Sequence, residues 1–214
     1  MEESTTKEKI LKRVRDALIS KKENPFQNVD FSSPVFEQET EEKEVAFARK
    51  LMENGGSFVY CENEKALGEN LKMLLEQKKW DAYDVTDKKL ELLLQSLDVP
   101  YRNNPETFLK MQAGITRCEY LIARFGSVLV SSGLDSGRRM FVYPETHIVV
   151  ATTSQVVPEL QDALTGMRKR YQEKFPSQMT VITGPSRTAD IEKTLVMGAH
   201  GPRELFVFVV DDED

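Results

Sequence analysis

The chain has 214 residues, of which 40% are hydrophobic and 30% are charged, and its formal net charge is −6 at pH 7. This length suits one sizeable α/β domain or a domain with a small appendage, and the composition is globular rather than disordered. The acidic balance argues against a nucleic-acid-binding domain, which presents a basic stripe to the phosphate backbone. No apolar run approaches the roughly 20 residues that cross a bilayer, and the polar start at Met1–Ser4 is unlike a signal peptide. We therefore expect a cytoplasmic protein without a membrane span.

The first predicted element is an amphipathic helix over residues 6–20, because its apolar side chains share one face: Ile10, Leu11, Val14 and Leu18. The polar segment 23–42 predicts an extended linker, in which three phenylalanines are possible anchors: Phe26, Phe31 and Phe36. A second helix follows and ends at Gly55-Gly56, where a positive φ costs little. We assign residues 1–44 to an N-terminal arm of helix and linker, and residues 45–214 to an α/β domain.

From Ser57 onward, segments typical of strands alternate with segments typical of helices. Strands are predicted at 58–61, 82–85, 127–131, 147–151, 179–183 and 205–210, and helices at 65–76, 88–97, 158–174 and 188–196. Thr116 and Glu119 have the spacing of a capping box, which predicts the start of a short helix. Apolar runs rich in Val and Ile suit parallel strands that are buried on both faces. The fold class is therefore α/β, an open and mostly parallel sheet with helices on both faces.

The chain has two cysteines, Cys61 and Cys118, and two histidines, His147 and His200. An iron–sulfur cluster normally takes about four thiolates in close spacing, and a zinc site of the C₂H₂ type needs its two cysteines near each other. We therefore expect no metal in this chain and two buried free thiols. Any cluster used by the protein's pathway is expected on another chain.

An open parallel sheet binds ligands beyond the carboxyl ends of its strands, and three loops are predicted to lie there. The loop 183–190 joins a predicted strand to a predicted helix. It contains the flexible glycine Gly184, the possible helix caps Ser186 and Thr188, the planar guanidinium of Arg187 and the carboxylate of Asp190. It is either an anion site at a helix N-terminus or a stiff turn with a capped helix.

The second loop, 131–139, is rich in hydrogen-bond donors and includes Gly133 and Arg138. It either closes over an acid or is a solvated connection. At the third site, His200 is either a general acid or base or a polar residue that directs the chain into the last strand. His147, at the head of an apolar strand, is interpreted as a satisfied core histidine.

Several stretches together form a distinctive pattern: Gly184–Glu192, Gly198–Pro202, Gly114–Thr116 followed by Ala123, Gly126 and Ser127, Pro144 with His147, and the spacing within 156–164. In these stretches the chain resembles the lactate utilization protein C family, which contains the LUD domain. This resemblance adds Gly126 and Ser127 to the candidate ligand-binding residues. We expect the loops at 126–127, 133–139 and 184–190 to converge at one edge of the sheet.

The resemblance implies a fold similar to ribose-5-phosphate isomerase, glucosamine-6-phosphate deaminase and the CoA transferases. It also implies a role in oxidising L-lactate to pyruvate, beside an iron–sulfur oxidoreductase and a cluster-bearing subunit. One departure is Arg124-Phe125, where the family usually has a glutamate and a threonine ahead of the glycine.

Two functions therefore stay open. The chain is either a subunit that binds a small anion and iron–sulfur partners, or a stand-alone enzyme acting on a phosphosugar or acyl-CoA. A subunit predicts an exposed apolar patch, whereas a lone enzyme predicts a deep pocket with perturbed titratable groups.

Overall fold

The computed structural model describes residues 5–19, 28, 30, 40–103, 111–189, 195–197 and 201–212. The chain forms two compact units, Met1–Gln38 and Glu39–Asp214. This division lies before the predicted boundary at residues 44 and 45, and both place the second predicted helix with the α/β sheet. The possible anchors Phe26, Phe31 and Phe36 lie outside the described residues. Among those described, no helix is both long and apolar enough to cross a membrane.

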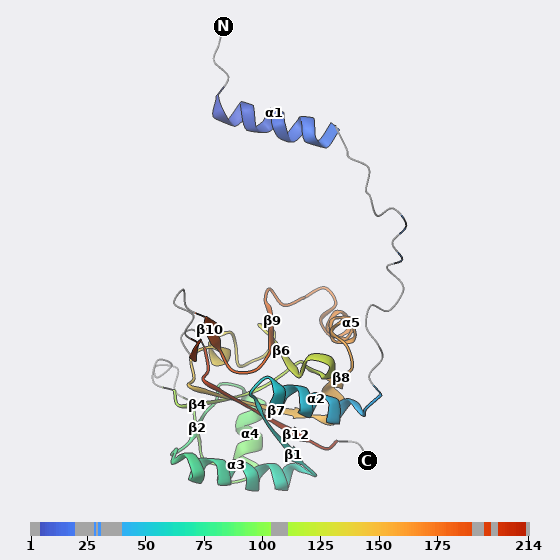
Figure 1. Cartoon of the computed structure of the whole chain (residues 1–214). Helices are drawn as coiled ribbons and strands as arrows, with labels where there is room; N and C mark the ends of the chain where they lie inside the picture. The colour runs from blue at the N-terminus through green and yellow to red at the C-terminus, as the bar shows by residue number, and fades with distance from the viewer. Residues whose placement is uncertain are drawn as a thin grey trace. The chain divides into compact units, whose positions relative to one another are not determined.

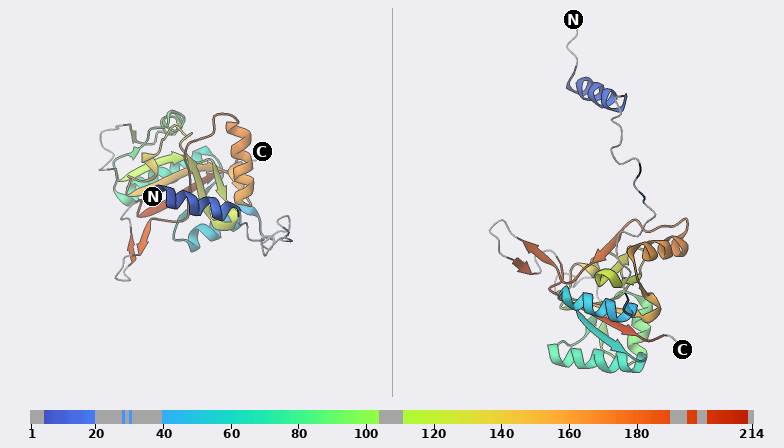
Figure 2. Two further views of the ribbon diagram at one scale, coloured as in Figure 1. Left: turned by 90° about the horizontal axis from the view of Figure 1, so that it is seen from above. Right: turned by 45° about the vertical axis from the view of Figure 1, so that its right-hand side comes forward.

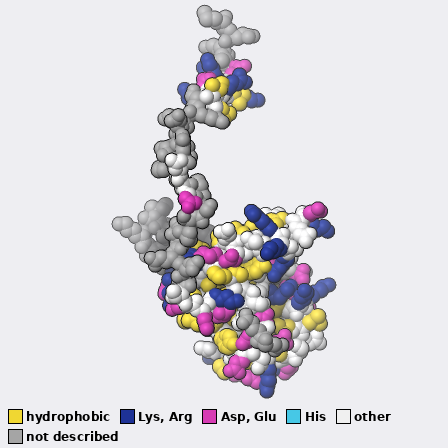
Figure 3. Space-filling model, turned by 90° about the vertical axis from the view of Figure 1, so that its right-hand side faces the viewer, with side chains coloured by type: hydrophobic (Ala, Val, Ile, Leu, Met, Phe, Trp, Pro, Cys, Tyr) yellow, Lys and Arg dark blue, Asp and Glu magenta, His cyan; other side chains and the backbone are white. Residues whose placement is uncertain are grey.

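In the first unit, the predicted amphipathic helix is confirmed as α1 (Thr6–Ile19). None of its residues is buried, and the side chains of its apolar stripe are at least half exposed: Ile10, Leu11, Val14 and Leu18. Figure 3 shows these apolar side chains beside the basic side chains of the same helix. Within the described residues of the first unit, the helix thus presents an uncovered apolar face.

The second unit is built on a six-stranded parallel sheet in the order β1-β12-β7-β4-β2-β3. Its strands are β1 (Ser57–Cys61), β2 (Tyr83–Asp84), β3 (Tyr101–Arg102), β4 (Ala113–Arg117), β7 (Thr146–Thr152) and β12 (Glu204–Val210). The predicted parallel sheet is confirmed in these strands, and the Val- and Ile-rich runs form its centre because both faces are buried.

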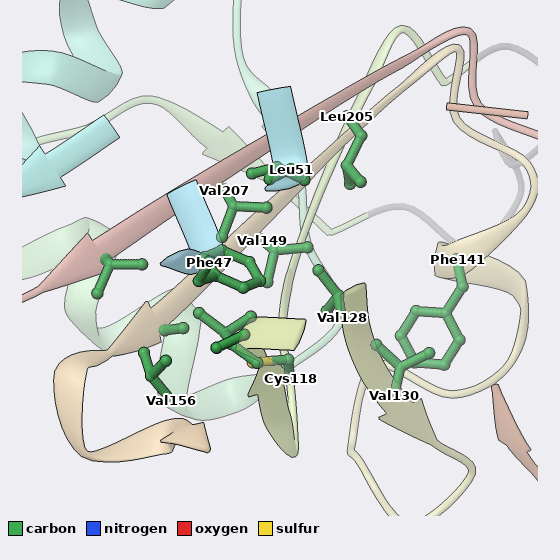
Figure 4. Packing of buried hydrophobic residues seen from close by; sticks show 14 of the residues in the cluster. Phe47, Leu51, Cys118, Val128, Val130, Phe141, Val149, Val156, Leu205 and Val207 are labelled. Carbon is green, nitrogen blue, oxygen red and sulfur yellow. The ribbon is translucent and has the colours of Figure 1, made fainter. Parts of the chain in front are cut away.

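Helices cover both faces of this sheet (Figure 1). On one face, α3 (Glu64–Lys78) and α4 (Lys88–Ser96) pack against Ile148, Val150 and Phe208. On the other face, α2 (Lys43–Glu53) inserts Phe47 and Leu51 among the alternate side chains of β7 and β12 (Figure 4). Because successive side chains of a strand point to opposite faces of the sheet, the apolar side chains of these strands are divided between two cores.

A second sheet of four strands, in the order β8-β5-β6-β9, lies on the α2 side. Its strands are β5 (Tyr120–Ile122), β6 (Ser127–Ser131), β8 (Val156–Val157) and β9 (Met179–Ile182). Helix α5 (Leu160–Tyr171) packs on it through Ala163 and Met167. The described residues of the unit also include 3₁₀ turns at η2 (Ala123–Phe125), η3 (Arg139–Phe141) and η4 (Thr153–Gln155).

Three predictions about these elements were wrong. The segments 127–131 and 179–183 pair antiparallel in the second sheet rather than joining the parallel one, and Val181 is exposed. Thr116 continues β4 instead of capping a helix, because it pairs with Val149 of β7. Its hydroxyl lies 2.8 Å from a ring nitrogen of His147. The described ends of the predicted helix 188–196 form an antiparallel pair instead, β10 (Arg187–Ala189) with β11 (Leu195–Met197), which projects from the unit in Figure 2.

Candidate functional site

The carboxyl edge of the parallel sheet contains a topological switch point between the neighbouring strands β2 and β4. The chain leaves β2 through α4 on one face, whereas it leaves β4 through β5 and β6 on the other face. Loops that diverge in this way open a crevice between them, where ligands of open α/β sheets bind. Asp87 follows β2 and Arg117 ends β4, so both lie at this point.

An ion pair joins the two sides of the switch point. The Arg117 side chain donates from Nε to Asp87 Oδ2 over 2.8 Å, and its Nη2 lies 2.7 Å from the same oxygen. The Asp87 side chain is fully buried, and its other oxygen caps α4 by accepting from the backbone N–H of Lys89 and Leu90. Because one carboxylate fixes both α4 and the guanidinium, Arg117 is held in place while 31% of its side chain stays exposed.

This edge forms a cleft of about 720 Å³. It is lined by the starts of α3 and α4 and by the ends of β4, β7 and β12, including Asn63, Lys89, Arg117, Thr152 and Asp212. The basic lining side chains, Lys89 and Arg117, come from the two sides of the switch point. We call this cavity the carboxyl-edge cleft.

The opposite wall of the carboxyl-edge cleft is acidic but already hydrogen-bonded. Asp212 accepts from the hydroxyls of Thr153 and Ser154, at 2.7 and 2.6 Å, and from the Ser154 N–H at 2.9 Å. Burial alone would raise the pKa of Asp212, but these hydrogen bonds outweigh it and hold that pKa well below its usual range. Tyr60 donates to Asp211 at 2.6 Å. An incoming anion would therefore be attracted to the Arg117 side of the cleft.

Of the three predicted loops, 133–139 is the one at this edge. The carboxylate of Asp135 lies 3.8 Å from Arg117, and the carbonyl of Ser136 accepts from Thr86. Gly133 donates its N–H to Ser131 Oγ at 3.0 Å, and Arg138 donates to Ser177 at 2.6 Å. Gly133 and Arg138 thus hold the loop, while Asp135 reaches the cleft.

The other two predicted loops meet at the opposite edge, around the end of α2. A Cβ on Gly126 would overlap the backbone of Leu51, and one on Gly184 would overlap the carbonyl of Asn54. Both glycines have positive φ, 59° and 70°. Asn54 also donates to the Phe125 carbonyl at 2.8 Å. These glycines permit close packing on α2, which is a structural role.

Ser127 and Arg187 belong to the same contact region. The Ser127 hydroxyl lies 2.8 Å from that of Thr183, and the exposed Arg187 guanidinium donates to the Asn54 carbonyl. The prediction that all three loops converge was therefore wrong, since two lie at the amino edge and one at the carboxyl edge. Thr188 lies in β10 rather than at a helix start, while Asp190 and His200 lie outside the described residues.

Ser186 lines a second cavity, of about 220 Å³, at the amino edge. His147 also lines it and is fully buried. Its Nε2 lies 2.8 Å from the Thr116 hydroxyl, but its Nδ1 has no hydrogen-bond partner among the described residues. Burial lowers the pKa of His147 to about 4, so the ring is neutral at pH 7. The prediction of a satisfied core histidine therefore holds for one ring nitrogen only.

Arg124, the departure from the family pattern, has a structural partner. Its Nε lies 2.5 Å from a carboxylate oxygen of Glu159, and its backbone N–H donates to the Pro158 carbonyl. Glu159 begins α5. The arginine therefore ties η2 to α5.

Both cysteines are buried and free, as predicted. Burial, with the nearby charge of Glu119, raises the pKa of Cys118 far above its usual value. Among the described residues, no group of His, Cys, Asp and Glu side chains is arranged to hold a metal ion.

Residues 35–210 match the family model of the LUD domain. The chain belongs to the LUD domain family. This LUD domain chain is 37% identical over 106 residues to lactate utilization protein C of Macrococcus caseolyticus, a match covering 49% of this chain and 46% of that protein. It is 38% identical over 101 residues to lactate utilization protein C of Bacillus subtilis, covering 46% and 42%. The matched part thus spans less than half the length of either relative.

A solved structure is also similar to this LUD domain chain. A DUF162 family protein from Deinococcus radiodurans superposes with a TM-score of 0.57, covering 78% of this chain and 96% of that chain at 16% sequence identity. This likeness shows the fold.

The sequence analysis missed Asp87, Lys89 and Arg117. Asp87 stands directly before a predicted helix, which is the signal of an N-cap and of a strand–helix junction. Arg117 was interpreted as part of a capping box, although it ends an apolar segment that pairs as a central strand.

Proposed function

We propose that this LUD domain chain serves lactate utilisation by binding a small 2-hydroxy or 2-oxo carboxylate, such as L-lactate or pyruvate, at Arg117. The redox centre of the system is an iron–sulfur cluster on a partner protein. The relatives named lactate utilization protein C support the pathway. The observation that supports the site is the fixed and partly exposed guanidinium at the switch point.

Arg117 has the geometry for a carboxylate. Asp87 occupies its Nε edge through a single oxygen, which orients the planar guanidinium. The second acid, Asp135, is 3.8 Å away and 60% exposed, so a ligand carboxylate can replace it at small cost. A guanidinium binds carboxylates through charge-assisted hydrogen bonds, which contribute about 1.5–3 kcal/mol each.

The cysteine count supports a cluster on a partner protein. Oxidation of a 2-hydroxy acid to a 2-oxo acid releases two electrons and two protons, and the two buried thiols are fewer than the roughly four that a cluster normally takes. We infer that the electrons pass to a cluster on another chain. The exposed apolar stripe of α1 supports partner binding, because such a face is covered when an amphipathic helix lies in an apolar groove.

The charge of α1 indicates which kind of groove on a partner protein would bind it. Helix α1 carries five basic and two acidic side chains, and its polar face includes Lys9, Lys12 and Arg13. An apolar groove with an acidic rim on the cluster-bearing protein would complement it.

Reconstitution tests this function. The chain is mixed with an iron–sulfur protein sought among the products of the genes beside its own, L-lactate is added, and the visible absorbance of the cluster is followed. We expect cluster reduction and pyruvate only in the complete mixture. Lactate turnover by the isolated chain with a soluble electron acceptor would contradict the proposal. Leu11→Gln with Val14→Gln should abolish co-purification with the partner, whereas Asp16→Gln on the polar face should retain it.

The volume of the carboxyl-edge cleft favours a second candidate function. At about 720 Å³ the cleft is in the range of sites for drug-sized ligands and is far larger than lactate needs. A stand-alone enzyme acting on a phosphosugar or an acyl-CoA would fill it. Titration of ribose 5-phosphate and coenzyme A beside lactate separates the two functions, since tight binding of either larger ligand without lactate binding favours the enzyme.

A further inference from the structure

The cavity at the amino edge is separate from the carboxyl-edge cleft. It lies where β7 and β12 begin, since His147 and Leu205 both line it, and β9 and η3 contribute Ile182 and Phe141. The loop at Ser186 closes another side. Its volume of about 220 Å³ accommodates a molecule of several non-hydrogen atoms.

His147 is the polar feature of this cavity that the fold does not explain. The ring is fully buried, and it is anchored on one side by the contact between its Nε2 and the Thr116 hydroxyl. Its Nδ1 has no hydrogen-bond partner among the described residues. Buried polar atoms are nearly always paired, because an unpaired one destabilises the folded state. The contact with Thr116 explains one ring nitrogen of the imidazole, and Nδ1 is the part that the fold leaves without a partner.

The walls of the cavity determine the charge of a ligand. The described lining residues are apolar side chains, two glycines, Ser186 and the neutral imidazole of His147, and none of them carries a charge at pH 7. A carboxylate or phosphate would lose its hydration here without gaining a cation. The cavity is therefore unsuited to lactate or to a sugar phosphate.

We propose that this cavity binds a small uncharged molecule with an apolar body and one hydroxyl or carbonyl group. The His147 ring is fully buried behind the cavity surface, so a small displacement of the lining side chains brings that group to Nδ1. The Thr116 contact orients the ring, so Thr116 is a positioning residue. Phe141, whose ring centroid lies 6.0 Å from that of His147, flanks the imidazole and supplies an apolar wall. The inference does not rest on the proposed function, because it concerns the opposite edge of the sheet.

Phenol and toluene test this inference, because they have nearly the same shape and differ in the hydroxyl. Each is titrated into the full chain, and the ring ¹⁵N resonances of His147 are followed by nuclear magnetic resonance. We expect saturable shifts at Nδ1 and about tenfold tighter binding of phenol, as one recognised hydrogen bond provides. Equal affinities, or shifts that leave His147 unmoved, would overturn the site.

Two variants and a lactate control test whether the preference for phenol depends on His147. In His147→Leu, the preference for phenol over toluene should fall to about one, while Thr180→Val, a change on β9 at a residue outside the cavity lining, should keep it. If His147→Leu does not fold, the phenol-to-toluene ratio in the wild type still decides. L-lactate at the same concentration should leave the His147 resonances in place, and saturable shifts with lactate would contradict an uncharged-ligand site.

Discussion

The buried imidazole makes a specific prediction about stability and pH. Burial lowers the pKa of His147 from its ordinary 6.5 to about 4, so the folded state binds a proton less readily than the unfolded state. The stability that this residue contributes is complete above pH 6.5 and is lost as the pH falls from 6.5 towards 4. The whole difference corresponds to about 3 kcal/mol, of which about 2.5 kcal/mol is lost at about pH 4.5.

The assay compares wild type with His147→Gln, whose amide does not titrate and can still reach Thr116. Urea denaturation at about pH 7 and about pH 4.5 gives the free energy of unfolding of both proteins. Carboxylates titrate equally in the two, so their effect cancels. We expect the loss of stability between these pH values to be about 2.5 kcal/mol smaller in His147→Gln. An equal loss in both proteins would refute the claim that His147 is buried and neutral.

Three further predictions follow from the described contacts. Gly126→Ala should lower the free energy of unfolding by about 2 kcal/mol more than Gly137→Ala, because both have positive φ but a Cβ on Gly137 meets no atom within 4 Å; equal losses would contradict the close approach to α2. Leu11→Gln with Val14→Gln should leave the melting temperature of the α/β unit unchanged, since their side chains are more than half exposed; a large drop would mean that α1 packs on the fold. Arg187→Ala, measured by thermal melting and lactate calorimetry, should lower stability slightly and keep lactate affinity; a loss of affinity would support the sequence prediction that Arg187 binds the anion.

Much of the fold could be predicted from local patterns. Runs such as His147–Ala151 and Leu205–Val210 are apolar on both faces, which is typical of central parallel strands, and both form them. The helix beginning at Lys88 could be predicted because Asp87 is a strong N-cap. The amphipathic period of α1 also required no tertiary information.

The choice between sheets could not be predicted in this way. Ser127–Ser131 has the same apolar character as a central parallel strand, yet it pairs antiparallel with Met179–Ile182. An apolar run shows that a strand is buried but not which strand lies beside it. Thr188 and Val196 pair across β10 and β11, and the expected helix there rested on a short pattern that tertiary pairing overrode.

The predicted site residues Gly126 and Gly184 lie away from the carboxyl-edge cleft, because the sequence did not show which sheet their strands join. Gly126 and Gly184 precede or follow strands of the second sheet, so the carboxyl-edge rule for parallel sheets did not apply to them. The rule does apply to Asp87 and Arg117, which follow and end true parallel strands. The proposed site at Arg117 therefore rests on strand pairing, which a glycine-rich loop does not reveal in the sequence.

Calorimetric titration of L-lactate and pyruvate tests the central claim most directly, and it requires a variant that removes the Arg117 charge without leaving a buried acid unpaired. Arg117→Met with Asp87→Asn meets this need, because asparagine is also a good N-cap. The matched control is Arg102→Met with Asp84→Asn, which neutralises the neighbouring pair with an N–O distance of 2.7 Å; neither residue lines the cleft.

We expect wild type and the Arg102 control to bind lactate or pyruvate with equal affinity, and the Arg117 variant to bind about 10- to 100-fold more weakly. Equal affinity in all three proteins, with the folds intact by circular dichroism, would contradict a carboxylate site at Arg117.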